Sequence, residues 1–309
     1  MSEHKAEAGL ILACADIVGE SIVWDDREHA LLWVDIVGRR IHRLVPETMD
    51  HRIWPCDEFP TSIGLRADGG AILGLTQRVA FWDFDDEFAT IAVPEPEMPG
   101  NRLNEGRVAP DGSFWVGTMA TNLTEDGAPK EQEARSGRYY RIDPDGVVSC
   151  LSGDLYGIPN TMLWPQPGVF VTADTIDNAL YRYAVSADGL RLSGRQRLGA
   201  AFERGCPDGS CLDAEGGIWT CRVAGGSCLT RTMLDGRLDR VVELPCSWPT
   251  SCAFGGDDLS TLYVTSARFT MSDGHLAEKP MEGGLFALRP GVSGMLEHRF
   301  GNHGSELER

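Results

Sequence analysis

The sequence has no apolar run that approaches the ~20 residues of a membrane-spanning helix, and segments with helical periodicity are nearly absent. It also has no GxSxG elbow, no GxGxxG after a strand, no P-loop and no HExxH. Nucleophile-elbow hydrolases, dinucleotide-binding proteins and zincins therefore have no support in this chain. With 42% hydrophobic and 24% charged residues among 309, the composition is that of a soluble globular protein.

Basic side chains are scarce, since 28 Lys and Arg residues face 46 Asp and Glu residues and the net charge is −18. Because such a surface repels phosphate backbones and anionic lipids, we expect no nucleic-acid and no membrane partner. No obligate protein partner is evident either. The nine cysteines are odd in number and include no CxxC pair, which is typical of reduced thiols and favours a cytoplasmic protein.

An internal repeat organises the chain. Six stretches share one layout: a small or polar anchor residue, four mostly apolar residues, an Asp/Gly/Pro turn and an apolar or aromatic strand. The anchors, spaced by about 42 to 55 residues, are Glu20, Ser62, Glu105, Asn160, Asp208 and Ser251. This spacing is close to the ~40–50 residues of a four-stranded propeller blade.

A second and weaker strand pattern follows each of these stretches and ends in turn residues. The two patterns together predict an all-β fold, a six-bladed β-propeller that occupies residues 1–309 as one domain with 1–14 and 301–309 peripheral. We expect residues 8–18 to supply the strand that closes the sixth blade. Two stacked β-sandwiches are the alternative, which the six-fold period disfavours.

In a propeller, the residues just before each innermost strand lie at one mouth of the central channel, so the six anchors should form a ring. Three acids and an amide on one axis repel one another unless protonated or neutralised by a cation. Their oxygens suit Ca²⁺, Mg²⁺ or Mn²⁺, with Zn²⁺ and Fe²⁺ as further possibilities. The alternative is that each anchor is a turn residue bonded to its own backbone.

Polar residues at 102–106 adjoin this ring. Arg102 offers a fork of donors to hydroxyl or carbonyl oxygens, and Asn104 offers a donor and an acceptor. A loop arginine paired with a surface acid is the alternative. The seven histidines show no metal-binding spacing and fall at termini, turns or outer strands, so we expect all of them on the surface.

The order of several short motifs resembles the SMP-30/gluconolactonase family of regucalcin-like lactonases over residues 15–300. The motifs are GESIVWD (19–25), LWVDI (32–36), RLNEG (102–106), WVGTM (115–119), PN (159–160), ADT (173–175), PDG (207–209), FGGD (254–257), LYVT (262–265) and GGLF (283–286). The resemblance implies a six-bladed propeller with one divalent ion in its channel, foremost Ca²⁺ or Zn²⁺, and hydrolysis of sugar lactones.

Carried over by position, the resemblance implies metal ligands at Glu20, Asn160 and Asp208 and substrate contacts at Arg102 and Asn104. Two positions depart from the family pattern. Glu105 stands where the family usually has Asp, and Asn122 is the nearest match to an acid that often follows the Gly-Thr-Met stretch. Both belong to the expected sugar-binding wall, so they leave the choice of lactone open.

The expected reaction is metal-assisted hydrolysis of a lactone, with Asp208 also the candidate general base. Arg102, Asn104, Glu105 and Asn122 would contact the sugar. Two alternatives stay open: a hydrolase of another ester or a phosphotriester on the same fold, and a non-catalytic metal-binding propeller. The polar loop at 120–135 is a candidate lid over the channel mouth.

Overall fold

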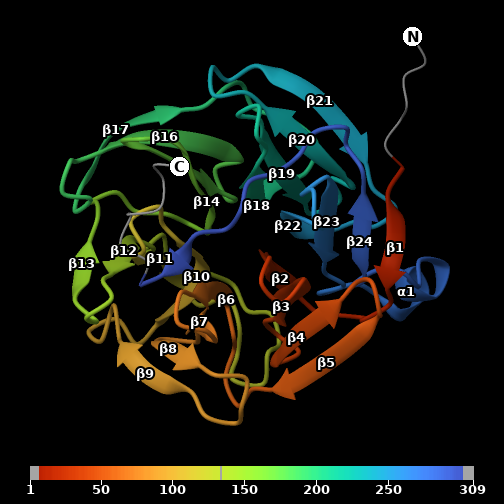
Figure 1. Cartoon of the computed structure of the whole chain (residues 1–309), viewed down its shortest axis with the longest axis horizontal. Coiled ribbons are helices and arrows are strands. Elements are labelled where there is room, and N and C mark those ends of the chain that lie inside the picture. The colour runs from red at the N-terminus through yellow and green to blue at the C-terminus, as the bar shows by residue number, and fades with distance from the viewer. Residues whose placement is uncertain (1–6, 133, 302–309) are drawn as a thin grey trace.

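The computed structural model describes residues 7–132 and 134–301. In these ranges six β-sheets surround a central channel (Figure 1), and the only helix is the short α1 (Asp273–Glu278). The predicted six-bladed β-propeller is therefore confirmed. No helix of the described residues is long and apolar enough to cross a membrane. Of the terminal segments expected to be peripheral, residues 1–6 and 302–309 lie outside the described ranges.

Each blade is a sheet whose strands run outward from the channel in chain order, except that blade 6 has β1 (Gly9–Leu12) at its outer edge and β25 (Arg299–Phe300) pairs with the first strand of blade 2. Blades 1 and 2 comprise β2 (Gly19–Asp25), β3 (Ala30–Asp35), β4 (Arg40–Val45), β5 (Asp50–Pro55), β6 (Ser62–Arg66), β7 (Ala71–Gly74), β8 (Val79–Trp82) and β9 (Ala89–Ala92). Blades 3 and 4 comprise β10 (Asn101–Val108), β11 (Phe114–Ala120), β12 (Tyr139–Ile142), β13 (Val148–Cys150), β14 (Pro159–Gln166), β15 (Val169–Asp174), β16 (Ala179–Val185) and β17 (Leu192–Arg197). Blades 5 and 6 comprise β18 (Cys206–Leu212), β19 (Ile218–Val223), β20 (Cys228–Thr232), β21 (Leu238–Glu243), β22 (Pro249–Gly255), β23 (Thr261–Ser266) and β24 (Leu285–Leu288).

The first strand of each blade lies nearest the channel axis (Figure 1) and contains one of the six anchors of the repeat. These strands are almost wholly buried, whereas an outer strand such as β5 is mostly exposed or half-buried. A strand enclosed on both faces is restricted in composition, which explains why the inner strands gave the stronger repeat.

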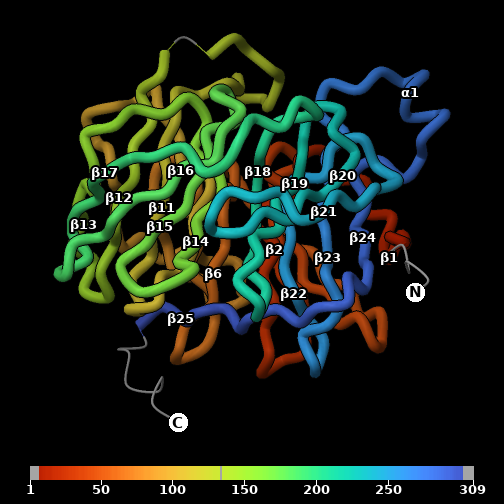
Figure 2. The backbone as a smooth tube through the Cα atoms, turned by 90° about the horizontal axis from the view of Figure 1, so that it is seen from above, coloured from red at the N-terminus to blue at the C-terminus, as the bar shows by residue number. Residues whose placement is uncertain are grey.

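Both ends of the chain contribute to closing the ring. Strand β1 (Gly9–Leu12) pairs with β24 and completes blade 6, as predicted for residues 8–18. Residues 289–300, here called the strap, cross the end of the channel opposite the loop at 120–135 (Figure 2) and finish in β25 (Arg299–Phe300), parallel to β6. The strap binds several blades: Ala214 N donates to Ser293 O and Gly294 N to Leu259 O, both at 2.8 Å.

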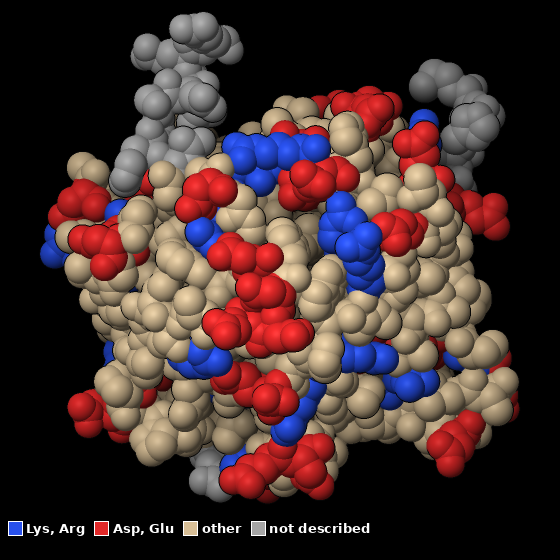
Figure 3. All heavy atoms as spheres, turned by 60° about the horizontal axis from the view of Figure 1, so that its bottom comes forward, with Lys and Arg blue, Asp and Glu red and all other residues tan. Residues whose placement is uncertain are grey.

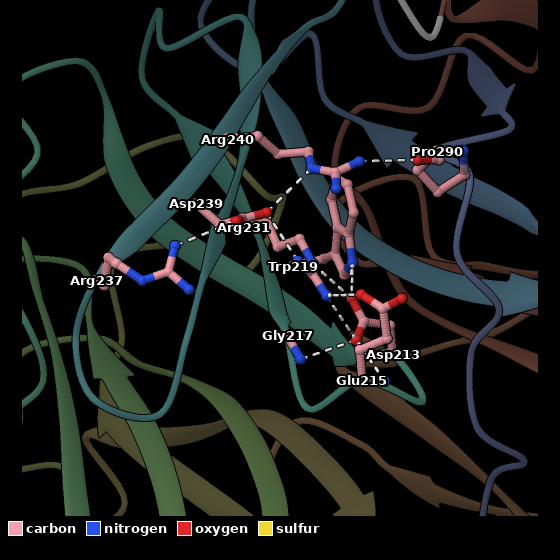
Figure 4. A network of polar contacts seen from close by, with 9 residues as sticks. All are labelled: Asp213, Glu215, Gly217, Trp219, Arg231, Arg237, Asp239, Arg240 and Pro290. Carbon is pink, nitrogen blue, oxygen red and sulfur yellow. Dashed lines mark hydrogen bonds and ion pairs between the residues drawn. The ribbon is translucent and has the colours of Figure 1, made fainter.

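Blade 5, which carries Asp208, is fixed by a buried ionic network (Figure 4). The Asp213 carboxylate accepts hydrogen bonds from Trp219 Nε1 and Arg231 Nε, each at 2.7 Å, so it joins the β18–β19 turn to β20. Arg231 Nη1 reaches Asp239 of β21 at 2.7 Å, and Arg240 Nη1 donates to Pro290 O of the strap at 2.9 Å. The network ties three strands and the strap into one unit.

The prediction that every histidine lies on the surface is wrong for His42, whose exposed fraction is 0%. Its ring stacks on Trp33, and its Nε2 lies 3.3 Å from Asp16 Oδ1. Burial lowers the pKa of His42 to about 3, so the ring is neutral and packs as an aromatic residue. The sequence concealed this because His42 stands between two half-buried arginines of β4, Arg40 and Arg43. His4 and His303 lie outside the described residues.

Candidate functional site: the channel mouth

The anchors lie within the innermost strands, and the expectation that they precede them is corrected. In five blades the anchor sits at or next to a β-bulge, where the pairing shifts register: between Glu20 and Val23, Leu103 and Gly106, Asn160 and Met162, Pro207 and Ser210, and Pro249 and Cys252. A bulge turns the local backbone and re-aims a side chain. The anchors can therefore face the channel while their strands continue the sheet.

Glu20, Asn160 and Asp208, the predicted metal ligands, are brought together at the channel mouth from blades 1, 4 and 5. They are 8%, 4% and 7% exposed. The carboxyl groups of Glu20 and Asp208 lie close enough to shift each other's pKa, and Asn160 adjoins the Asp208 carboxyl. Two neighbouring buried acids do not both stay ionised unless a cation lies between them. Without a cation, one of them holds a proton.

The electrostatics of this pair follow from its burial. Burial is the main cause that raises the pKa of Glu20 and of Asp208 well above their usual values, and the charge of Glu105 raises both further. The charge of Asp208 adds to the effect on Glu20. A divalent cation would offset the repulsion between these carboxylates and stabilise their ionised forms. The chemistry of the donor set therefore fits such an ion.

Within the described ranges, no three His, Cys, Asp or Glu side chains are grouped so that they could hold a metal ion. This agrees with the composition of the set, because only two of its members are acids and the third is the amide of Asn160. Carboxylate and amide oxygens are ligands of hard divalent ions. The donor set thus differs from a cysteine or histidine metal site.

The Asn160 amide is held in one orientation by its neighbours. Asn160 Nδ2 donates to Thr175 Oγ1 at 2.8 Å, and Thr175 Oγ1 donates to Pro207 O at 2.8 Å. On the other side, Asn104 Nδ2 donates to Asn160 Oδ1 at 3.1 Å and to Pro159 O at 2.9 Å. Both ends of the Asn160 amide therefore have polar partners, which fix its orientation beside Asp208. Sequence reasoning noted Thr175 only within a family motif and missed this role.

Arg102 continues the network toward the mouth. Its Nη1 donates to Leu103 O and Asn104 Oδ1, both at 2.8 Å, and its Nη2 donates to Asn122 Oδ1 at 3.1 Å. Burial lowers the pKa of Arg102 to about 10, and the charge of Glu20 acts in the opposite direction. Three of the predicted sugar contacts, Arg102, Asn104 and Asn122, are thus brought together beside the carboxylate pair.

Glu105 lies between the Glu20 and Asp208 pair and two charged residues that sequence reasoning missed, Arg107 and Glu297. Burial raises the pKa of Glu105 to about 7, opposed by the charge of Arg107 and assisted by that of Glu297 from the strap. Arg107 Nη1 donates to Ser210 O at 2.9 Å, and its Nη2 lies 3.9 Å from Glu297 Oε1. A cavity of about 50 Å³ at the strap end is lined in part by Arg107, Phe254 and Glu297.

The other two anchors, Ser62 and Ser251, line the channel as well. Both hydroxyl oxygens are buried without a hydrogen-bond partner. Small residues of neighbouring inner strands pack against them, since a Cβ on Gly106 would lie 2.5 Å from Ser62 Oγ and one on Gly209 would lie 2.8 Å from Ser251 Oγ. Their role in the ring is therefore to allow close approach of the strands.

The loop at 120–135 begins at this wall. Lys130 N donates to Asn122 O at 2.8 Å, and Gln132 Nε2 donates to Gly157 O at 2.6 Å. The first bond lies within the loop, and the second connects the loop to the segment that precedes β14 of blade 4. Its function as a lid stays a prediction.

Comparison with known proteins agrees with this architecture. A family profile for the SMP-30/Gluconolactonase/LRE-like region matches residues 18–268. The chain is 33% identical to a 6-deoxy-6-sulfogluconolactonase of Pseudomonas putida, over 92% of this chain and 95% of that one. It is 32% identical to regucalcin of Gallus gallus, over 92% and 94%. The crystal structure of a calcium-binding regucalcin from Agrobacterium tumefaciens superposes with a TM-score of 0.84 at 27% identity, over 94% of this chain and 96% of the other. The chain belongs to the SMP-30/gluconolactonase/LRE-like family.

Proposed function

We propose that the protein is a metal-dependent hydrolase that opens sugar (aldono-) lactones to the corresponding aldonic acids. The observation that carries the proposal is the buried pair Glu20 and Asp208, which forms no ion pair with any described Lys, Arg or His and lies beside the Asn160 amide. Family membership and the sulfogluconolactonase relative support a lactone substrate. The calcium-binding regucalcin supports a divalent ion, for which Ca²⁺ and Zn²⁺ come before Mg²⁺, Mn²⁺ and Fe²⁺.

When bound by Glu20, Asn160 and Asp208, the cation would polarise the lactone carbonyl and stabilise the negative charge that develops on its oxygen. Asp208 is the proposed general base and takes a proton from the attacking water. The water oxygen bonds to the carbonyl carbon, the ring carbon–oxygen bond breaks, and the proton passes to the ring oxygen. The product is the open hydroxy acid.

Four side chains would bind and orient the sugar. Arg102 and Asn104 present donors and an acceptor at the mouth, and Asn122 holds the Arg102 guanidinium. Glu105 would contact the sugar from the side of Arg107. Because all except Asn122 are nearly buried, they lose little further entropy when substrate binds. Their replacement should change KM and selectivity as well as kcat.

The test is a panel of pentono- and hexono-lactones, with acid release measured on protein loaded with a single divalent ion. A phosphotriester and a simple carboxylic ester are assayed side by side. Turnover of lactones above the other esters is the expected result. Preferential turnover of the phosphotriester or the simple ester would overturn the substrate assignment, and tight ion binding without turnover of any ester would favour a non-catalytic metal-binding propeller.

A further inference from the structure

Arg102 is a buried cation whose hydrogen bonds reach no carboxylate. Its exposed fraction is 6%, and its hydrogen bonds go to neutral oxygens only, those of Leu103, Asn104 and Asn122. In the described part of the chain it forms no ion pair, and its Nε is buried without any partner. An uncompensated buried charge is costly, so such a group is retained where a ligand completes it.

Other buried arginines of this protein are satisfied within the fold. Arg231 pairs with Asp213, Glu215 and Asp239, and Arg107 faces Glu297. Arg222 has no carboxylate partner, but its Nε and Nη2 donate to three carbonyl oxygens and to Asn178 Oδ1. Arg102 alone among these four combines a buried unpaired Nε with a position at the channel mouth.

Cation binding sharpens this imbalance. The carboxylate whose charge reaches Arg102 is Glu20. A divalent ion held by Glu20, Asn160 and Asp208 takes up the charge of both acids, so the guanidinium becomes the uncompensated charge at the mouth. Acidic side chains predominate in the composition and are grouped among basic ones on the face shown in Figure 3. With a net charge of −18 the protein as a whole repels anions, so a preference for an anionic substrate must come from the site itself.

We infer that the preferred substrate is a sugar lactone that carries an anionic exocyclic group, such as a sulfonate, a carboxylate or a phosphate, which binds Arg102. The inference rests on the proposed lactonase function and names its substrate class. The planar fork of Arg102 suits two oxygens of such a group, and the free Nε with the neighbouring Nη2 is the edge available to it. The neutral side chain of Asn122 leaves the charge of Arg102 open to a substrate anion, because an acid at position 122 would pair with the guanidinium.

The test compares kcat/KM for 6-deoxy-6-sulfogluconolactone, for a lactone bearing an exocyclic carboxylate or phosphate, and for neutral gluconolactone. Charge-assisted hydrogen bonds predict a preference of at least about tenfold for an anionic lactone. In Asn122→Asp the new carboxylate lies 3.1 Å from Arg102 Nη2 if it keeps the Asn122 geometry, so the preference should fall about tenfold.

Asn178→Asp is the matched control, since it places the same carboxylate beside Arg222, outside the channel mouth. The substrate ratio should not change in this variant. Thermal unfolding of both variants shows whether either has lost the fold. A preference of twofold or less in the wild type, or an equal drop in both variants, would overturn the inference.

A binding measurement separates this inference from the proposed function. Calorimetry compares 6-deoxy-6-sulfoglucose with glucose, neither of which contains a lactone bond, on ion-loaded and ion-free protein. Tighter binding of the sulfonated sugar, by about tenfold or more when the ion is present, supports the anion site even if no lactone is hydrolysed. Turnover of neutral lactones together with equal affinity for both sugars would refute the anion site and leave the lactonase proposal standing.

Discussion

Replacing Thr175 by Val tests whether the Asn160 amide is held in place for a cation. Valine keeps the shape of threonine but removes the hydroxyl that accepts from Asn160 Nδ2 and donates to Pro207 O. The buried amide then loses a partner, which costs about 1–3 kcal/mol. Because Asn104 then orients the Asn160 amide from one side without Thr175 on the other, affinity for the divalent ion should fall by about 10–100-fold, the usual effect of losing a partner that orients a ligand.

The assay is calorimetric titration of ion-stripped protein, accompanied by denaturant unfolding of the ion-free form. Thr175→Ser keeps the hydroxyl and should bind the ion within about threefold of the wild type. A purely structural role predicts lower stability with unchanged affinity. Unaltered ion affinity in Thr175→Val would therefore refute the assignment of Thr175 as a positioning residue.

Two further predictions concern the fold. Burial, with the charge of Asp35, raises the pKa of Asp16 to about 7. The folded state therefore binds this proton more tightly than the unfolded state does. The contribution of Asp16 to stability is then lost as pH rises from about 4 to about 7. Urea unfolding across this window should show a weaker decline in Asp16→Asn than in the wild type, and parallel curves would contradict it. A Cβ on Gly294 would lie 2.1 Å from Phe254 Cβ, so Gly294→Ala should lift the strap and lower the melting temperature, whereas Gly153→Ala, with nothing within 4 Å, should not. Equal melting temperatures for the two variants would show that the strap tolerates the change.

The sequence predicted the parts of this fold that repeat. Inner strands such as β2 and β22 are enclosed on all sides, so their composition is constrained blade after blade and the anchors could be aligned. The closing strand β1 was predictable because an unclosed sixth blade would leave an exposed edge. Glu20, Asn160 and Asp208 converge because equivalent positions in a ring must meet at its axis.

What the sequence could not predict depends on contacts between blades. Thr175 orients Asn160 through a carbonyl of the next blade, and Glu297 reaches the channel from a strap far along the chain. The bulges at the anchors shift them into the strands, which a spacing count cannot resolve. His42 looked like a surface residue because the polar pattern of β4 does not reveal that Trp33 and Asp16 enclose its ring.

The central claim is that Glu20 and Asp208 hold the ion on which lactone hydrolysis depends. The most direct measurement titrates single divalent ions into chelator-stripped wild type, Glu20→Gln and Asp208→Asn, and records ion occupancy and lactone turnover on the same samples. We expect one ion per wild-type chain, turnover that rises in proportion to occupancy, and loss of both in the two variants. Full turnover of the stripped wild type, or unchanged ion affinity in both variants, would contradict the account.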